Sequence, residues 1–151
     1  MSVIVVGVDH SPGAKAALLF ANEEARLRKA TIRAIHAWQY GYIGYTGPEG
    51  SVPLVGADIE QLRGAAQAAL EASVREALPD TDVEVELHAI QGAPASVLVE
   101  ASRDADLLVV GSRGHGGFVG LLLGSVGQQC AHHAACPVVI VHPKREKAPA
   151  P

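Results

Sequence analysis

The strongest signal for the fold lies in residues 107–126, which read LLVVGSRGHGGFVGLLLGSV. The run begins with four apolar residues, the pattern of a strand that is buried on both faces. A glycine-dense loop follows, and Gly124 and Ser125 open a segment with helical spacing. Glycines let backbone N–H groups approach an anion closely, and a helix start adds unpaired N–H groups and a positive dipole end. The stretch therefore predicts a strand, a phosphate-binding loop and a helix.

The same alternation of strand and helix extends over the whole chain. Apolar runs predict five strands, at residues 3–9, 31–38, 83–88, 106–110 and 137–141. Helical spacing and cap signals predict four helices, at residues 12–29, 58–78, 94–103 and 125–134. The strand at 83–88 reads VEVELH, so it has one wet face and is expected at a sheet edge. The order of elements predicts an α/β fold with one doubly wound parallel sheet and helices on both faces.

Length and composition limit the class of protein. A chain of 151 residues is expected to form one domain, and 48% apolar with 19% charged residues argues against global disorder. The formal net charge of −4, without a strong basic cluster, argues against binding to nucleic acid. No apolar run is long enough to span a membrane, and no export signal is recognisable. We therefore expect a cytoplasmic protein that does not bind membranes, with Cys130 and Cys136 as reduced thiols.

The fold class also predicts where a ligand binds. Doubly wound sheets bind ligands beyond the carboxyl ends of the strands, where the strand order reverses. The pattern alone leaves the strand order open. If the order is 3-2-1-4-5, the ends of the first and fourth strands are neighbours, and these ends carry Asp9 and Gly111. The glycine loop would then lie over the crevice between them.

Two common phosphate-binding motifs are absent from the sequence. The Walker P-loop ends in Gly-Lys-Ser/Thr, a triplet that the chain lacks. The dinucleotide fingerprint places G-x-G-x-x-G after the first strand, where this chain reads GVDHSP over residues 7–12. What remains is Gly111, two residues, Gly114, nine residues, and then Gly124 and Ser125.

This spacing resembles the signature of the nucleotide-binding branch of the universal stress protein family, and the resemblance extends over nearly the whole chain. It includes the segments VGVDHS (6–11), IHA (35–37), GAP (92–94), DLLVVGSRG (106–114), GLLLGSV (120–126) and CPVVIV (136–141). The resemblance implies a flavodoxin-like domain over residues 1–142 that binds ATP, followed by a flexible tail at 143–151. It also implies a homodimer joined through the last strand, here Val138–Val141. Pairing would cover an apolar edge that is otherwise an aggregation hazard.

The resemblance assigns most of the predicted site to the glycine loop and the helix that follows it. These residues are Gly111, Ser112, Arg113, Gly114, His115, Gly116, Gly117, Gly124, Ser125 and Val126. Backbone amides of the loop would surround the ribose and the phosphates, and the helix start with the Ser125 hydroxyl would bind phosphate. Each role has an alternative: turn geometry for the glycines, a solvated side chain for Arg113, and an ordinary N-cap for Ser125.

Three further residues complete the predicted site. Asp9 is expected at the ribose and base end, with or without Mg²⁺, and its alternative role is to cap the helix that begins near Ser11. Gly7 would leave room for the nucleotide, or it would serve tight packing of the strand on a helix. Ala37 would offer its backbone to adenine, at a position where the family commonly has valine.

Some features depart from the family or lie outside the predicted site. Gly127 replaces a small hydroxyl residue or alanine, which would weaken phosphate binding and cost about 0.5–1 kcal/mol of helix stability. The cysteines and histidines of residues 130–136 are expected not to bind a metal, because Pro137 directly follows Cys136 and a common tetrahedral focus is hard to build. The connection at 39–56, which holds all three tyrosines, is either a lid or a surface excursion.

The chain thus offers binding chemistry and no recognisable catalytic set. Of the predicted site residues, Asp9, Arg113 and Ser125 are the only candidates for phosphoryl transfer, so hydrolysis is expected to be slow or absent. We expect an ATP-dependent regulator that contacts an unidentified protein partner. The alternatives are a regulator that binds AMP or cyclic AMP, a weak ATPase or kinase-like transferase, and an interaction module without a nucleotide.

Overall fold

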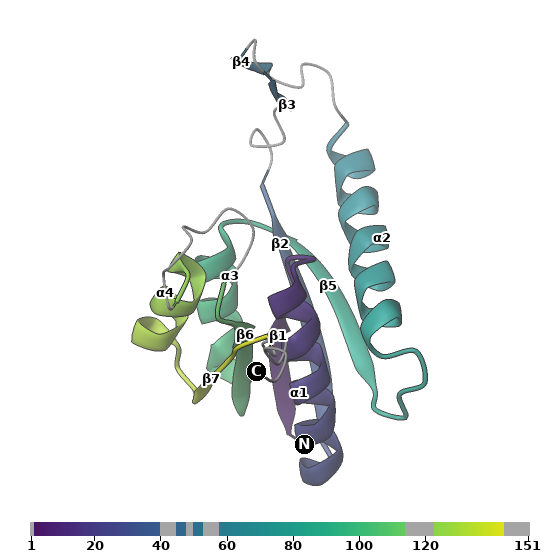
Figure 1. Ribbon diagram of the computed structural model, residues 1–151, viewed down its shortest axis with the longest axis vertical. Coiled ribbons are helices and arrows are strands. Elements are labelled where there is room, and N and C mark those ends of the chain that lie inside the picture. Colours follow the sequence, from purple (N-terminus) through teal and green to yellow (C-terminus); the bar gives the residue numbers. More distant parts are fainter. Residues whose placement is uncertain (1, 40–44, 48–49, 53–57, 114–122, 144–151) are drawn as a thin grey trace, which may run out of the picture.

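The computed structural model of the chain describes residues 2–39, 45–47, 50–52, 58–113 and 123–143. Within this part, five parallel strands form the main sheet in the order β5-β2-β1-β6-β7 (Figure 1). The strands are β1 (Val3–Gly7), β2 (Thr31–Trp38), β5 (Val85–Gln91), β6 (Leu107–Gly111) and β7 (Val138–Val141). Numbered along the chain, the order is 3-2-1-4-5, so the predicted doubly wound α/β fold is confirmed. The strand order reverses between β1 and β6, which pair with each other.

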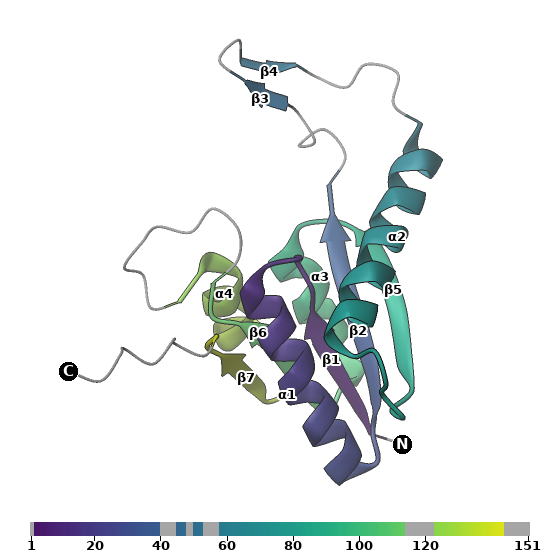
Figure 2. The same cartoon turned by 45° about the vertical axis from the view of Figure 1, so that its right-hand side comes forward.

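Helices cover both faces of the sheet (Figure 2). On one face, α1 (Pro12–Arg28) and α2 (Ile59–Ala77) pack on alternate strand residues such as Ile4 and Ile32. On the other face, α3 (Pro94–Ala101), the short 3₁₀ helix Ser102–Asp104 and α4 (Ser125–His133) pack on the residues between them, such as Val5. This two-sided burial explains why the central strands read as continuous apolar runs. In the described part of the chain, no helix is both long and apolar enough to cross a membrane.

The start of α1 has the cap that the sequence predicts. Ser11 is the N-cap residue, and its Oγ accepts a hydrogen bond from the backbone N–H of Ala14 at 3.2 Å. Pro12 occupies the first helical position, where its missing N–H is not needed. The helix ends at Lys29, whose backbone is left-handed with a φ of 55°. The cap directs the end of β1 into the helix and so places Asp9 at the carboxyl edge of the sheet.

Several predicted boundaries are wrong by a few residues. The first strand ends at Gly7 rather than residue 9, because the chain turns at His10, which has a φ of 66°. The third predicted strand runs over Val85–Gln91 rather than 83–88, since its register follows β2 as far as Trp38. Its predicted place at a sheet edge is confirmed.

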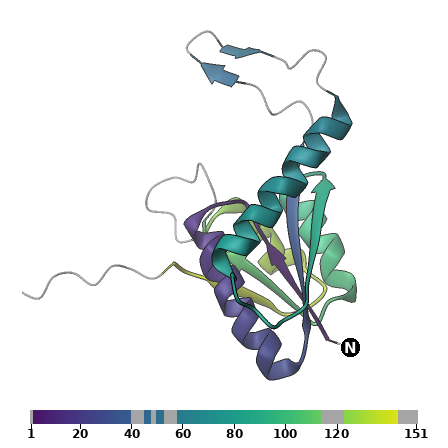
Figure 3. The same ribbon diagram turned by 90° about the vertical axis from the view of Figure 1, so that its right-hand side faces the viewer.

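The connection between β2 and α2 contains structure that the sequence did not predict. β3 (Tyr45–Gly47) and β4 (Gly50–Val52) form a short antiparallel hairpin, with Tyr45 opposite Val52 (Figure 3). Tyr40 and Tyr42 lie outside the described residues, as do residues 144–151 of the predicted tail. A lid role for this connection therefore stays a prediction, and so does the flexible tail.

Candidate functional site

A cavity of about 340 Å³ lies at the carboxyl ends of β1, β2 and β6, against the start of α4. Its volume is within the range of small-molecule sites. The residues that line it are Gly7, Val8, Asp9, Ser11, Ile35, Ala37, Pro94, Leu98, Val110, Gly111, Ser112, Arg113, Gly124, Ser125, Val126 and Gly127. The structure thus brings together every predicted site residue that it describes. Gly114, His115, Gly116 and Gly117 lie outside the described residues, and their role stays a prediction.

The sequence missed most of the apolar wall of this cavity. Ile35 comes from β2, where it lies opposite Gly7, and Val110 comes from β6, while Pro94 and Leu98 come from one side of α3. The spacing of Pro94 and Leu98, four residues apart, places both on one helix face. That signal was available, but the sequence does not show which strands that face meets. The wall offers a flat organic ring an apolar environment.

The start of α4 differs from the prediction in one respect. Gly124 is the N-cap residue and Ser125 is the first helical residue, so the alternative of Ser125 as N-cap is wrong. The backbone explains the shift, because the N–H of Gly124 donates to the carbonyl of Ser112 at 2.6 Å and sets the turn one residue earlier. Because Gly124 has no side chain, no N-cap side chain bonds to the backbone N–H groups at the start of α4, and the first turn holds no acidic residue. The N–H groups at this helix start are therefore available to an anion.

Ser112 lies beside that helix start and is almost completely buried, with 1% of its surface exposed. Its backbone N–H donates to the carbonyl of Val141 at 2.9 Å, which fixes it at the end of β7. Its side-chain Oγ has no hydrogen-bond partner among the described residues. A buried hydroxyl without a partner costs about 1–3 kcal/mol, so such groups usually have one. Ser112 also lines the cavity, so this unpartnered hydroxyl belongs to a residue of the site.

Asp9 lines the same cavity and lies just after the end of β1. Its Oδ1 accepts hydrogen bonds from the backbone N–H of Ser11, at 3.1 Å, and from the Ser11 hydroxyl. Asp9 therefore does support the start of α1, which was its alternative role. Its second oxygen, Oδ2, has no hydrogen-bond partner among the described residues, and the residue is exposed and lines the cavity. The carboxylate can thus support the helix and still accept a hydrogen bond from a ligand.

Two of the predicted glycines lie at close contacts, one with a side chain and one with the backbone. A Cβ atom on Gly7 would lie 2.8 Å from Cδ1 of Leu98, so a larger residue would require the Leu98 side chain on α3 to shift. A Cβ atom on Gly111 would lie 2.9 Å from the carbonyl carbon of Gly13, in the first turn of α1. Neither observation tests contact with a nucleotide. Both are consistent with the alternative roles, which were strand–helix packing for Gly7 and turn geometry for Gly111.

Gly127 packs against the residue that precedes the helix. A Cβ atom there would lie 2.7 Å from Cδ1 of Leu123, whose carbonyl accepts a hydrogen bond from Gln128 Nε2 at 3.2 Å. The missing side chain thus gives Leu123 room to fold against the first turn of α4. The departure from the family pattern at this position therefore has a local packing reason.

The cavity has one charged group of each sign among its described lining residues, Arg113 and Asp9. Arg113 is exposed, and its backbone carbonyl lies against Gly13. In the described part of the chain, no three His, Cys, Asp or Glu side chains are grouped to hold a metal ion. Burial raises the pKa of the Cys130 thiol to about 11, and burial together with Asp106 raises the pKa of Cys136. Both cysteines are free and protonated at neutral pH.

Comparison with known proteins gives the family. The model described as the universal stress protein family matches residues 1–142. A universal stress protein from Mycolicibacterium smegmatis is 35% identical over 144 residues, which cover 93% of this chain and 46% of that protein. Universal stress protein Rv2623 from Mycobacterium tuberculosis is 35% identical over 98% of this chain and 50% of its own length. The chain thus spans about half the length of the curated relatives that it matches.

Solved structures agree with this match. A universal stress protein in complex with cAMP is 28% identical with a TM-score of 0.68, covering 95% of this chain and 98% of that chain. The universal stress protein from Archaeoglobus fulgidus in complex with dAMP is 26% identical with a TM-score of 0.59, covering 93% and 97% of the two chains. Sequence match and fold therefore lead to the same conclusion: this chain belongs to the universal stress protein family.

Proposed function

We propose that the cavity binds an adenine nucleotide, specifically ATP, and that the bound state regulates a stress response through contact with a partner protein. One observation carries the proposal: the α4 start without a side-chain cap adjoins the buried, unpartnered hydroxyl of Ser112. Both features supply hydrogen-bond donors, and both line the same cavity. A helix start with free N–H groups is a ready-made site for an anion such as phosphate.

The rest of the cavity suits the remaining parts of a nucleotide. Ile35, Pro94 and Leu98 provide an apolar wall for the base, and the backbone of Ala37 lies at the same end of the sheet. Asp9 Oδ2 is free to accept a hydrogen bond from a ribose hydroxyl. Two solved relatives above 25% identity hold cAMP and dAMP, and they support an adenine nucleotide as the ligand.

Magnesium, where it accompanies ATP, would depend mainly on the nucleotide for its ligands. Asp9 is the one carboxylate among the described cavity-lining residues, so the protein offers the ion a single anionic ligand. Mg²⁺ commonly keeps several waters and binds through one or two carboxylates together with substrate phosphates. The ion would neutralise phosphate charge next to Asp9. The same scarcity of charged groups supports slow or absent hydrolysis.

The proposed assembly is a homodimer through β7. All four residues of Val138–Val141 are β-branched, apolar and only partly buried. They lie at an edge of the sheet, where a second chain can pair with the strand and cover them. The cytoplasmic location and the domain boundary at residue 142 stay predictions.

The first experiment is native mass spectrometry of the protein as purified, without added nucleotide. A retained adenine nucleotide supports the proposal, and its mass identifies the species. Protein that carries no nucleotide and shows no binding of ATP in a subsequent titration would contradict it.

A competing candidate is a regulator that binds AMP or cyclic AMP, which the cAMP and dAMP complexes of the two relatives favour. A competition titration with ATP, AMP and cyclic AMP separates the candidates. If AMP displaces ATP at equal concentration, the proposed contacts of Ser125 with the outer phosphates are wrong. Turnover measured with Mg²⁺ on the wild type and on Asp9→Ala tests the weak ATPase, because a rate that does not depend on Asp9 indicates a contaminant.

A further inference from the structure

The two edge strands of the main sheet, β5 and β7, differ in whether a side chain bonds to their outward backbone groups. β5 pairs only with β2, and β7 pairs only with β6, within the described part of the chain. An edge strand presents unpaired N–H and C=O groups to which another chain can add a strand. Unless one edge is protected, a chain with two such edges could assemble without limit.

The hydrogen bonds of β5 show which of its backbone groups point outwards. The carbonyl of Glu84 accepts from Ile32 N at 3.0 Å, and Gly92 N donates to Trp38 O at 2.8 Å. The even-numbered residues of this strand therefore direct their backbone groups toward β2. Backbone groups of successive residues point to opposite sides of a strand, so those of Leu87 and Ala89 face away from the sheet.

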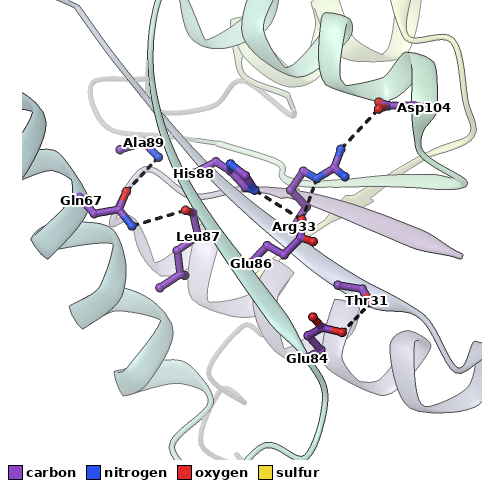
Figure 4. A network of polar contacts seen from close by, with 9 residues as sticks. All are labelled: Thr31, Arg33, Gln67, Glu84, Glu86, Leu87, His88, Ala89 and Asp104. Atoms are coloured by element: carbon purple, nitrogen blue, oxygen red, sulfur yellow. Dashed lines mark hydrogen bonds and ion pairs between the residues drawn. The ribbon is translucent and has the colours of Figure 1, made fainter. Parts of the chain in front are cut away.

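Gln67, on α2, occupies these outward groups (Figure 4). Its Nε2 donates to the carbonyl of Leu87 at 3.4 Å, and its Oε1 accepts from the N–H of Ala89 at 3.3 Å. In a parallel sheet, one residue of a neighbouring strand donates to residue i−1 and accepts from residue i+1. The side-chain amide of Gln67 thus makes both bonds that an added parallel strand would make opposite His88, and an antiparallel strand would need the same two backbone groups.

The β7 edge has no equivalent protection among the described residues. The carbonyls of Pro137 and Val141 accept from β6 and from Ser112, at 2.9 Å each, so the odd-numbered residues face the sheet. Val138 and Ile140 therefore direct their backbone groups outwards. No side chain in the described part of the chain bonds to those groups.

We infer that Gln67 guards the β5 edge against strand addition by a second copy of this chain, and so confines strand pairing between copies to β7. The guard rests on the geometry of β5 alone, while the use of β7 as the remaining edge rests on the proposed homodimer. Removal of the Gln67 amide would leave Leu87 O and Ala89 N without these bonds. An extended strand from a second chain could then bond to both groups.

Sedimentation velocity on Gln67→Ala over a range of protein concentrations tests this inference. The wild type is expected to stop at the dimer, whereas Gln67→Ala is expected to form heavier species whose share grows with concentration. Gln61→Ala is the matched control, because Gln61 is exposed on the same helix and loses the same atoms. Gln67→Met serves as a second variant, since it keeps the length of the side chain and removes both hydrogen bonds.

A second substitution identifies the edge that is responsible. Adding Ala89→Pro to Gln67→Ala removes the outward N–H, and proline disfavours strand pairing, so the heavier species should disappear. Ile140→Pro removes an outward N–H of β7 and tests the homodimer separately. If Ile140→Pro leaves the wild-type mass unchanged, the β7 dimer is wrong while the guard stands. Folded Gln67→Ala and Gln67→Met that both sediment like Gln61→Ala would overturn the guard.

Discussion

The backbones of Gly111 and Gly13 are in direct contact. A Cβ atom on Gly111 would lie 2.9 Å from the carbonyl carbon of Gly13 and 3.0 Å from its carbonyl oxygen. The end of β6 thus rests on the first turn of α1, with no side chain between them. This contact brings the start of the glycine loop next to the segment that carries Asp9. The cavity depends on that approach, since residues of both segments line it.

Gly111→Ala is expected to destabilise the protein by about 1–3 kcal/mol, because the added methyl group meets backbone atoms that cannot move aside easily. Urea unfolding measures the change. Gly64→Ala is the control, since a Cβ atom there meets nothing within 4 Å and the residue lies inside α2. That substitution should stabilise the protein by about 0.5–1 kcal/mol. Equal stabilities of the two variants would contradict the close contact.

Ser112→Ala should weaken nucleotide binding about fivefold to tenfold and should keep or raise the free energy of unfolding of the nucleotide-free protein, since burial of an unpartnered hydroxyl is itself unfavourable. The hydroxyl has no partner among the described residues, so its removal costs the free protein nothing, while the complex loses one hydrogen bond. Isothermal titration calorimetry and urea unfolding give the two quantities.

Ser102→Ala provides the opposite pattern as a control. Ser102 is also fully buried, but its Oγ donates to Val99 O at 2.6 Å and accepts from Ala135 N at 2.8 Å. Its loss should cost about 1–3 kcal/mol of stability and leave the affinity of the folded protein unchanged. If Ser112→Ala behaved like Ser102→Ala, a structural role for the Ser112 hydroxyl would replace the binding role.

Asp9→Asn separates the two roles of Asp9. The amide oxygen can still accept from Ser11, so the start of α1 is retained, while the negative charge that faces the cavity is lost. We expect weaker nucleotide binding with a change in stability below about 1 kcal/mol, the size of a typical neutral hydrogen bond. Ser11→Ala, which removes the N-cap, should instead cost about 0.5–2 kcal/mol of stability. Unchanged affinity of Asp9→Asn would confine Asp9 to the helix start.

Cys130 should make stability depend on alkaline pH. Burial raises the pKa of its thiol from 9.0 to about 11 in the folded protein, because the apolar surroundings disfavour the thiolate. Between these values the unfolded chain loses the proton and the folded protein keeps it, so stability falls as pH rises. Cys130→Ala should reduce that slope in urea unfolding between pH 8 and pH 11, values chosen to span the shift. A slope that is identical in both proteins would show that Cys130 does not contribute.

Much of the architecture was predictable from local pattern. Apolar runs, helix caps and the spacing of Gly111, Gly124 and Ser125 depend on residues close together in the chain, and they identified the main-sheet strands, the helices and the family. Boundaries were less predictable. The N-cap of α4 is Gly124 because a hydrogen bond to Ser112, from twelve residues earlier in the chain, sets that turn.

The strand order, and with it the juxtaposition of distant residues, came only from tertiary contacts. Three contacts join segments that lie far apart in the chain: Gly7 with Leu98, Gly111 with Gly13, and Gln67 with the edge of β5. Neither segment of such a pair carries a sequence pattern that reveals its partner. The apolar wall and the unpartnered hydroxyl of Ser112 have the same origin. Sequence periodicity shows which face of an element is buried, whereas packing of the whole chain determines what that face meets.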